Sequence, residues 1–352
     1  MLEISGITKV PTFQYEDKDF NLVVTTANGL KSRFDSFLTE KWQDARENGI
    51  FWVDLNIPKE RTLPGNYGFL AQLHPDKGKK RRKLQVITSM LQPFDSREFN
   101  FTNLPNEEIL FDVGNGDGND IVAVNVSPSG KYHSLLIVER FKCLPQRATR
   151  HSIEKAVDLM LLSNSPYFRI IFNSSCAHAS VNHLHWHLYY LKRDMPLESI
   201  KLNHLRGPVF MLKEFPAKGF CLKLSSFSDP NAIGDLVSWT YFIIDRLHKS
   251  EIPYSVCLTR AKENIGDNVY EDVRVYIWGR KPGTRVTNRF DFAPSVCEFF
   301  GHLIITSRQL YDELTEESVD KILNDLTSDS FSAVRDDVLG MDLNGKELIM
   351  AP

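Results

Sequence analysis

The sequence predicts an α+β fold made of two similar halves, each a sheet backed by a helix. Two long amphipathic helices are expected, over 150–163 and 230–248, and short apolar segments typical of strands precede and follow each of them. A polar stretch at 196–201 separates the two sets of elements. We therefore expect a histidine-rich first half over 1–197 and a second half over 198–352.

Further helices are predicted from apolar spacing and capping residues. A helix over 33–48 has Ser32 as its cap, and the helix over 230–248 has Asp229 in the same role. A last helical region begins near Glu316. Residues 50–85 mix strand and turn signals. The remaining strand-like segments are 121–126, 134–138, 168–173, 182–191, 254–260 and 273–280, with a strand pair within 209–224 and an apolar stretch at 296–306.

The loop over residues 114–120 is rich in glycine, aspartate and asparagine and resembles a calcium loop at first sight. An EF-hand loop starting at Asn115 requires glutamate at its twelfth position, where Val126 stands. We therefore expect an ordinary turn between two strands.

Composition excludes several classes of protein. The chain has 352 residues, 42 of them Lys or Arg and 45 Asp or Glu, so its net charge of -3 argues against a dedicated nucleic-acid or membrane-surface binder. The five cysteines include no C-x-x-C pair, which argues against a disulfide framework and a cysteine zinc site. No apolar run approaches the ~18 residues of a membrane span, and the N-terminus lacks signal-peptide features. We expect a cytoplasmic protein.

The segment His183-Leu-His185-Trp-His187 carries the chemistry. On a strand, residues two apart share a face, so the three imidazoles are expected to point one way while Leu184 and Trp186 point into the core. Three interpretations remain open on this pattern alone: a zinc site, a structural role on a half-wet strand, or a nucleophilic histidine that attacks phosphorus. A neutral imidazole is available at cellular pH because its ordinary pKa is about 6.5.

This pattern of alternating histidine and apolar residues resembles the signature of the histidine triad superfamily. The turn that follows Asn125 and leads to a strand headed by His133 is similar to the strand–turn–strand unit of that superfamily. The resemblance implies that His185, the middle histidine, attacks a nucleotide α-phosphate and forms a covalent nucleotidyl-histidine.

A closer resemblance covers residues 65–302. Five fragments occur in the order found in the GDP-hexose phosphorylases, relatives of galactose-1-phosphate uridylyltransferase. These fragments lie at 65–73, 92–95, 99–101, 180–185 and 298–302. The branch that acts on GDP-L-galactose usually has glutamine at the third histidine, so His187 favours the branch that acts on GDP-D-glucose. The chain departs from the family at His74, where asparagine is usual, and at Cys176 and Ala177, where glycines are usual.

The resemblance also implies a set of substrate contacts. Asn100, between Phe99 and Phe101, would read the guanine, and the guanidinium groups of Arg81 and Arg82 would suit phosphate oxygens, although both arginines also fit a solvated basic loop. The full set of expected substrate-binding residues is His183, His187, Ser180, Asn173, Asn125, Asn100, Phe99, Phe101, Gln72, Arg81 and Arg82. Glu298 and His302 could cap a helix or orient the active-site strand.

The implied reaction is phosphorolysis of GDP-D-glucose to GDP and glucose 1-phosphate. The expected partners are therefore a GDP-sugar and inorganic phosphate, with no metal and no cofactor, and a chain with two such halves could act as a monomer. Alternatives are a nucleotide or nucleotide-sugar hydrolase of the same superfamily, a GDP-L-galactose phosphorylase and a non-enzymatic nucleotide-binding regulator.

Overall fold

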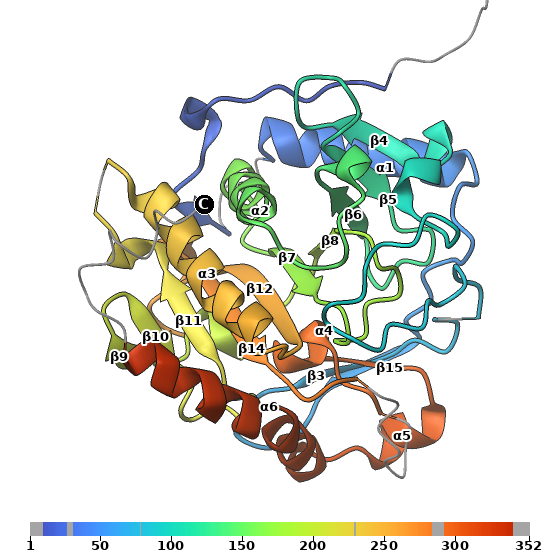
Figure 1. Ribbon diagram of the computed structural model, residues 1–352. Helices are drawn as coiled ribbons and strands as arrows, with labels where there is room; N and C mark the ends of the chain where they lie inside the picture. Colours follow the sequence, from blue (N-terminus) through green and yellow to red (C-terminus); the bar gives the residue numbers. More distant parts are fainter. Residues whose placement is uncertain (1–9, 27–30, 78, 229, 284–291, 341–352) are drawn as a thin grey trace, which may run out of the picture.

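The computed structural model of the protein describes residues 10–26, 31–77, 79–228, 230–283 and 292–340. Its central feature is a ten-stranded sheet in which every neighbouring pair is antiparallel (Figure 1). In spatial order the strands are β4 (Ile109–Asp112), β5 (Ile121–Val124), β6 (Ser134–Ile137), β8 (Trp186–Tyr190), β7 (Phe168–Asn173), β12 (Tyr254–Ala261), β14 (Asp272–Gly279), β11 (Phe220–Lys223), β10 (Val209–Met211) and β9 (Asn203–Arg206).

The sheet contains one topology twice. From its outer edge inward, the first half runs β4-β5-β6-β8-β7 and the second runs β9-β10-β11-β14-β12. In both halves a long helix follows the third strand, and the last two strands are exchanged in position. The two halves meet where β7 pairs with β12, with Cys257 opposite Ile171. The predicted duplication within an α+β fold is therefore confirmed.

Three helices cover one face of the sheet. They are α1 (Arg33–Glu47), α2 (Arg150–Leu162) and α3 (Ala232–Lys249), and α2 and α3 lie side by side in Figure 1. Alternate strand residues such as Leu188, Ile170 and Val256 join the apolar faces of these helices in one continuous buried core. Ser32 caps α1 and Thr149 caps α2, since each side chain accepts a hydrogen bond from the third residue of its helix.

The other face carries a second core and a small sheet. In this sheet β3 (Leu70–Leu73) pairs with β2 (Lys59–Thr62) on one side and, in parallel, with β15 (His302–Ile305) on the other. The short helices α4 (Val296–Phe299) and α5 (Arg308–Glu313) flank β15, and α6 (Glu316–Leu339) follows and reaches both cores. The strands β1 (Val24–Thr25) and β13 (Val269–Tyr270) form a separate pair.

Most of the predicted elements are confirmed, with two differences at their ends. The strand expected over 182–191 begins only at Trp186. The helix expected from 230 begins at Ala232 after Asn231, and its expected cap, Asp229, lies outside the described residues. None of the described helices is long and apolar enough to cross a membrane.

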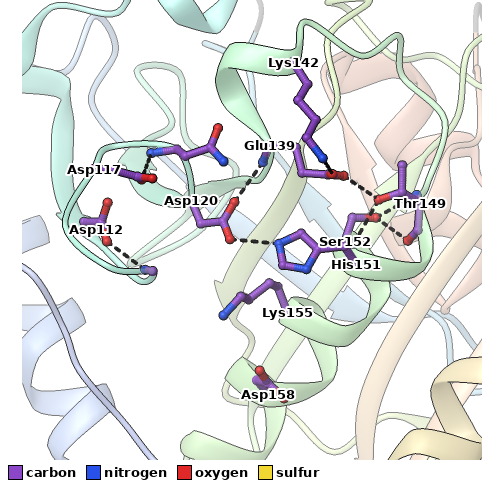
Figure 2. A network of polar contacts seen from close by, with 12 residues as sticks. Asp112, Asp117, Asp120, Glu139, Lys142, Thr149, His151, Ser152, Lys155 and Asp158 are labelled. Carbon is purple, nitrogen blue, oxygen red and sulfur yellow. Dashed lines mark hydrogen bonds and ion pairs between the residues drawn. The ribbon is translucent and has the colours of Figure 1, made fainter.

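The loop over 114–120 is a turn organised by a carboxylate. Asp112 at the end of β4 accepts hydrogen bonds from the backbone N–H groups of Gly114, Gly116 and Gly118, at 2.7–2.9 Å. At the end of the loop, Asp120 accepts from the N–H of Glu139 at 2.8 Å and pairs with His151 of α2 at 2.9 Å (Figure 2). The predicted turn between strands is therefore confirmed, and the carboxylates of Asp112 and Asp120 stabilise it by accepting backbone hydrogen bonds.

The segment between the two halves is buried. Residues 196–198 form a single 3-10 turn in which Leu197 and Glu198 have no exposed surface. Glu198 forms an ion pair with Arg169 of β7, and its carbonyl oxygen accepts from the N–H of Lys262 just after β12. This polar stretch is thus a tightly packed connection, and the boundary between 197 and 198 remains a prediction.

Candidate active site

A large cavity lies over the face of the sheet opposite the helices. Its volume is about 1200 Å³, and both halves of the chain line it. The first half contributes the end of β5, the start of β8, the loop over 174–180 and an extended segment over 84–88. The second half contributes the residues around α4 and β15. His185 and His187 both face this cavity.

His185 is held at its backbone by a residue from a distant loop. Its N–H donates to Oε1 of Gln146 at 2.9 Å, and its carbonyl oxygen accepts from Nε2 of the same side chain at 2.9 Å. Gln146 also donates to the carbonyl oxygen of Asn173 at 2.9 Å and is itself buried. The amide of Gln146 therefore ties the start of β8 to the end of β7.

The ring of His185 is held in one tautomer. Its Nδ1 lies 2.7 Å from the carbonyl oxygen of His183, which can only accept, so Nδ1 carries the proton and Nε2 keeps its lone pair. Burial lowers the pKa of His185 to about 4, although the hydrogen bond to His183 opposes this shift. The ring is therefore neutral near pH 7, with a lone pair on Nε2, and His185 lines the cavity.

His187 is held in the opposite tautomer by His133. The backbone N–H of Ser129 donates to Nδ1 of His133 at 2.9 Å, so the proton of a neutral His133 lies on Nε2. That nitrogen lies 3.0 Å from Nδ1 of His187 and donates to it, and its 3.2 Å contact with Nδ2 of Asn125 is then not a hydrogen bond, because both groups are donors. Burial lowers the pKa of His133 to about 3 and that of His187 well below its ordinary value. Neutral His187 thus carries its proton on Nε2 and can donate it to an anion.

His183 does not share the cavity with the other two histidines. Its Nδ1 accepts from the N–H of Phe101 at 3.0 Å, and its Nε2 donates to the carbonyl oxygen of Arg140 at 3.1 Å. The expected common face fails here because the chain still bends at His183, three residues before β8 begins at Trp186, whereas His185 directly precedes the strand. His183 is therefore held by backbone groups outside the cavity, and this geometry does not favour a direct contact between His183 and the substrate.

Four further expected residues line the cavity. The structure brings Ser180, Asn173, Asn125 and Arg81 to the cavity with His185 and His187. Oδ1 of Asn173 accepts from Oγ of Ser255 at 2.8 Å and from the N–H of Val296 at 3.2 Å, so it joins the two halves at the cavity wall.

The expected guanine contacts lie outside the cavity. Asn100 is buried, and its side chain accepts from the N–H of Thr102 at 3.1 Å as a helix cap. Phe101 belongs to a buried cluster against which Phe99 packs. Arg82 pairs with Glu108 and its guanidinium lies 4.1 Å from the ring centroid of Phe99. That these four residues contact substrate stays a prediction, and in this structure their polar groups and rings make contacts within the protein.

Gln72 lies at a smaller, separate cavity of about 320 Å³. Its Nε2 donates to Glu60 at 3.0 Å, which leaves Oε1 to accept from Nε2 of His302 at 2.8 Å and of His74 at 3.2 Å. Ser129 lines both this cavity and the large one. His302 therefore orients a neighbouring polar cluster, and His74 belongs to the same cluster.

The loop before the histidines adopts a backbone that favours glycine. Cys176 has φ 59° and His178 has φ 69°, in the left-handed region that costs other residues roughly 1–2 kcal/mol. The N–H of Gly283 donates to the carbonyl oxygen of Cys176 at 2.6 Å, and a Cβ at Gly283 would lie 2.8 Å from the ring of His178. The left-handed backbone at Cys176 thus accounts for the glycine that is usual at that position in the family, whereas Ala177 has no positive φ.

Sequence reasoning missed three residues of this site. Gln146 lies in a loop without periodicity, and His133 was noted only as the head of a strand. Lys77 belongs to a basic run that is typical of a solvated loop, yet it lines the cavity. In the part of the chain that the structure describes, no group of three or more His, Cys, Asp or Glu side chains is arranged to hold a metal ion.

Two family models match the chain in succession. The model described as "GDPGP1-like, N-terminal domain" matches residues 33–189, and "GDPGP1-like, C-terminal domain" matches residues 193–343. Together they span most of the sequence.

Curated relatives and solved structures extend this match. The chain is 35% identical over 321 residues to "GDP-D-glucose phosphorylase 1" of Danio rerio, covering 88% of this chain and 92% of the relative. It is 37% identical to the protein of that name in Bos taurus, over 81% and 77% of the two chains. It is 28% identical to "GDP-L-galactose phosphorylase 2" of Arabidopsis thaliana, over 83% and 72%. A crystal structure of yeast Ap4A phosphorylase Apa2 shares its fold, with TM-score 0.63, 17% identity and coverage of 84% and 97%.

Proposed function

The chain belongs to the GDPGP1-like family, and we propose that it phosphorolyses GDP-D-glucose through a guanylyl group carried on His185. The observation that carries this proposal is the fixed tautomer of His185, whose neutral Nε2 faces a cavity large enough for a nucleotide sugar. Relatives named for GDP-D-glucose are 28–37% identical to the chain and those named for GDP-L-galactose are 27–28% identical, so the highest identities favour glucose as the sugar.

In the first half-reaction Nε2 of His185 attacks the α-phosphorus of GDP-glucose. A P–N bond forms, and the bond from the α-phosphorus to the bridging oxygen breaks, with its electron pair leaving on glucose 1-phosphate. A phosphate monoester has a second pKa of about 6, so this leaving group needs little help from a general acid. The rigid backbone clamp from Gln146 holds the attacking nitrogen in line with the bond that breaks.

In the second half-reaction inorganic phosphate attacks the guanylyl-histidine. A phosphate oxygen forms the new P–O bond, the P–N bond breaks, and its electron pair returns to Nε2, so that GDP leaves and neutral His185 is restored. The proton on Nε2 of His187 can donate to a non-bridging oxygen in both steps, where negative charge develops. Ser180 and Asn125, which also line the cavity, are proposed to bind phosphate and ribose respectively.

A covalent-labelling experiment tests the nucleophile. Wild-type protein incubated briefly with GDP-glucose in the absence of phosphate should gain one guanylyl mass, and subsequent phosphate should release GDP. His185→Asn should gain no mass and should lose turnover, while its circular dichroism stays that of the wild type. His204→Asn is the matched control, because His204 lies on the exposed edge of β9, away from the cavity. If His185→Asn still acquires the guanylyl mass, His185 is not the nucleophile.

A further inference from the structure

Lys77 enters the cavity from the end of the small sheet. It follows β3 by four residues, and its backbone N–H donates to the carbonyl oxygen of His74 at 3.2 Å, in the turn that ends the strand. The N–H of His74 in turn donates to the carbonyl oxygen of Ile305 at 2.7 Å, so the turn is fixed by the β3–β15 pairing. Lys77 is half-buried and lines the same cavity as His185 and His187.

The charge of Lys77 affects two of the histidines that line the cavity, His133 and His187. Beyond the effect of burial, it repels positive charge on His133 and His187, and thereby lowers the pKa of both. It also acts on His302 and on the thiol of Cys297, which lie on the side of the second half. Burial lowers the pKa of His185, and the charge of Lys77 does not contribute to that shift. Lys77 and His187 thus line the same cavity, and the positive charge of Lys77 acts on His187 and not on His185.

No carboxylate in the described residues forms an ion pair with Lys77, although two acids are close in sequence or in the cavity. Asp76 is engaged by Lys79 and by Asn56 at 2.7 Å. Glu298 accepts from the N–H and Oγ of Ser295 at 2.8 and 2.9 Å and from the N–H of Ile304 at 3.1 Å. A half-buried ammonium without a carboxylate partner, in a cavity that the neutral His133 and His187 also line, is a site suited to an anion, because burial of a charge without a partner is costly.

The sequence of bond changes in the proposed reaction identifies the anion that would bind next to Lys77. The α-phosphorus must lie at Nε2 of His185, so the phosphate that leaves lies next to it, and the inorganic phosphate that enters must approach along the same line. Both phosphates therefore occupy one position in turn. Building on the proposed phosphorolysis, we propose that Lys77 binds this neighbouring phosphate: the β-phosphate of GDP-glucose in the first half-reaction and inorganic phosphate in the second.

This assignment explains how the site prefers phosphate over water. Water needs no cation in order to attack the guanylyl-histidine: its oxygen forms the new P–O bond, a proton passes to solvent, and GMP leaves as the P–N bond breaks. Phosphate, in contrast, brings negative charge to a phosphorus that already carries negative oxygens. The ammonium of Lys77 offsets that repulsion and holds the attacking oxygen in line.

Lys77→Met tests the assignment because it keeps the length of the side chain and removes its charge. A charge-assisted hydrogen bond contributes roughly 1.5–3 kcal/mol, so kcat/KM for phosphate should fall about 10- to 100-fold. The fraction of product released as GMP should rise, while His185 still becomes guanylylated. Lys77→Arg should restore part of the GDP yield. Lys79→Met is the matched control, since Lys79 is exposed and pairs with Asp76, and it should leave both quantities unchanged.

A second measurement uses the wild-type protein and does not depend on a variant that folds. Acylation of Lys77 by an amine-reactive reagent, followed by mass spectrometry of its peptide, should slow when inorganic phosphate is present, whereas Lys79 should react equally with and without it. Equal reaction of Lys77 in both conditions, or an unchanged GDP-to-GMP ratio in Lys77→Met, would overturn the assignment to Lys77 alone. Wild-type protein that forms no GDP from GDP-glucose and phosphate would instead overturn the proposed function.

Discussion

At the scale of single residues, the protonation of His185 sets how guanylylation depends on pH. Burial lowers the pKa of His185 to about 4, so the lone pair on Nε2 is present throughout the neutral range and is lost only below that pH. The rate of guanylylation at limiting GDP-glucose reports the free protein. We expect this rate to stay level from neutral pH down to about pH 5 and to fall only near pH 4.

Single-turnover measurements after brief pH jumps would check this profile. They should be brief because unfolded histidines bind protons at about pH 6.5, so the protein loses stability as the pH falls below that value. Circular dichroism at each pH separates the loss of fold from the loss of nucleophile. A midpoint near 6.5 in protein that is still folded would contradict the fixed, buried imidazole.

Residues of this site that follow a local sequence pattern could be predicted, and residues that follow no such pattern could not. The spacing of two places His185 and His187 correctly at the cavity. The same spacing fails for His183, whose ring is engaged by backbone groups of other segments. The side-chain amide of Gln146 forms a hydrogen bond with the backbone of His185, 39 residues away, and no sequence pattern predicts such a contact.

At the scale of elements, the network around Asp120 and His151 anchors the segment that carries Gln146. Asp120 fixes the start of this segment through the N–H of Glu139 and the start of α2 through His151 (Figure 2). Glu139 also accepts from Oγ1 of Thr149, the cap of α2, at 2.9 Å. The loop between Glu139 and Thr149 is thus closed at both ends, which holds Gln146 against His185.

Asp120→Asn should weaken the anchoring of the loop between Glu139 and Thr149, and the size of this effect should depend on pH. The hydrogen bond that His151 donates to Asp120 raises the pKa of His151, so the stability that their pairing contributes is present below about pH 6.5 and is lost as the pH rises through the folded pKa of His151. Burial raises the pKa of Asp120, but hydrogen bonds from His151 and the N–H of Glu139 outweigh it, and the pKa is lowered. The contribution of Asp120 is therefore lost in acid.

Nuclear magnetic resonance titration of the His151 ring would measure the effect. In Asp120→Asn the pKa of His151 should fall, and the difference in unfolding free energy from wild type should be larger in mildly acidic solution than at alkaline pH. Asp117→Asn is the control, because Asp117 is exposed and accepts from the nearby N–H of Asn119 at 2.8 Å. An unchanged His151 pKa would show that the pair does not form in solution.

Elements are predictable here where the signal is local. The bounds of β7 agree with the sequence, and α1, α2 and α3 lie within two residues of the expected helices. The pairing of β3 with β15 could not be predicted, because strands more than two hundred residues apart that pair in parallel leave no turn signal between them. That pairing is what places Lys77 at the cavity.

At the scale of the whole molecule, the duplicated topology is not matched by a duplicated set of histidines, because the histidines that line the cavity all come from the first half. By its place in the fold β14 is the counterpart of β8, and its residues Asp272–Gly279 include no histidine. The second half nevertheless supplies the cavity wall around α4 and β15. The repeated outline of strands, helix and strands could be predicted from the sequence, whereas the junction of β7 with β12 follows only from the structure.

The buried ion pair between Arg169 and Glu198 spans this junction. Arg169 lies on β7, and its guanidinium also donates to the carbonyl oxygens of Pro166 and Phe168 at 2.6 and 2.9 Å. Glu198 also accepts from the hydroxyl of Tyr270 in the second half at 3.3 Å. Since neither Arg169 nor Glu198 has exposed surface, the loss of one charge leaves the other without a partner in the core.

Glu198→Gln should therefore destabilise both halves together, by about 3–5 kcal/mol in the free energy of unfolding. The β7–β12 pairing and the continuous helix-side core couple the halves, so unfolding should remain a single transition. Hydrogen exchange followed by mass spectrometry should show equal loss of protection in peptides from β8 and from β14. Asp312→Asn, which breaks only the exposed pair with Arg308, should change little. Loss of protection confined to β8 would mean that the halves unfold independently, and that the ion pair stabilises the catalytic half without joining it to the other.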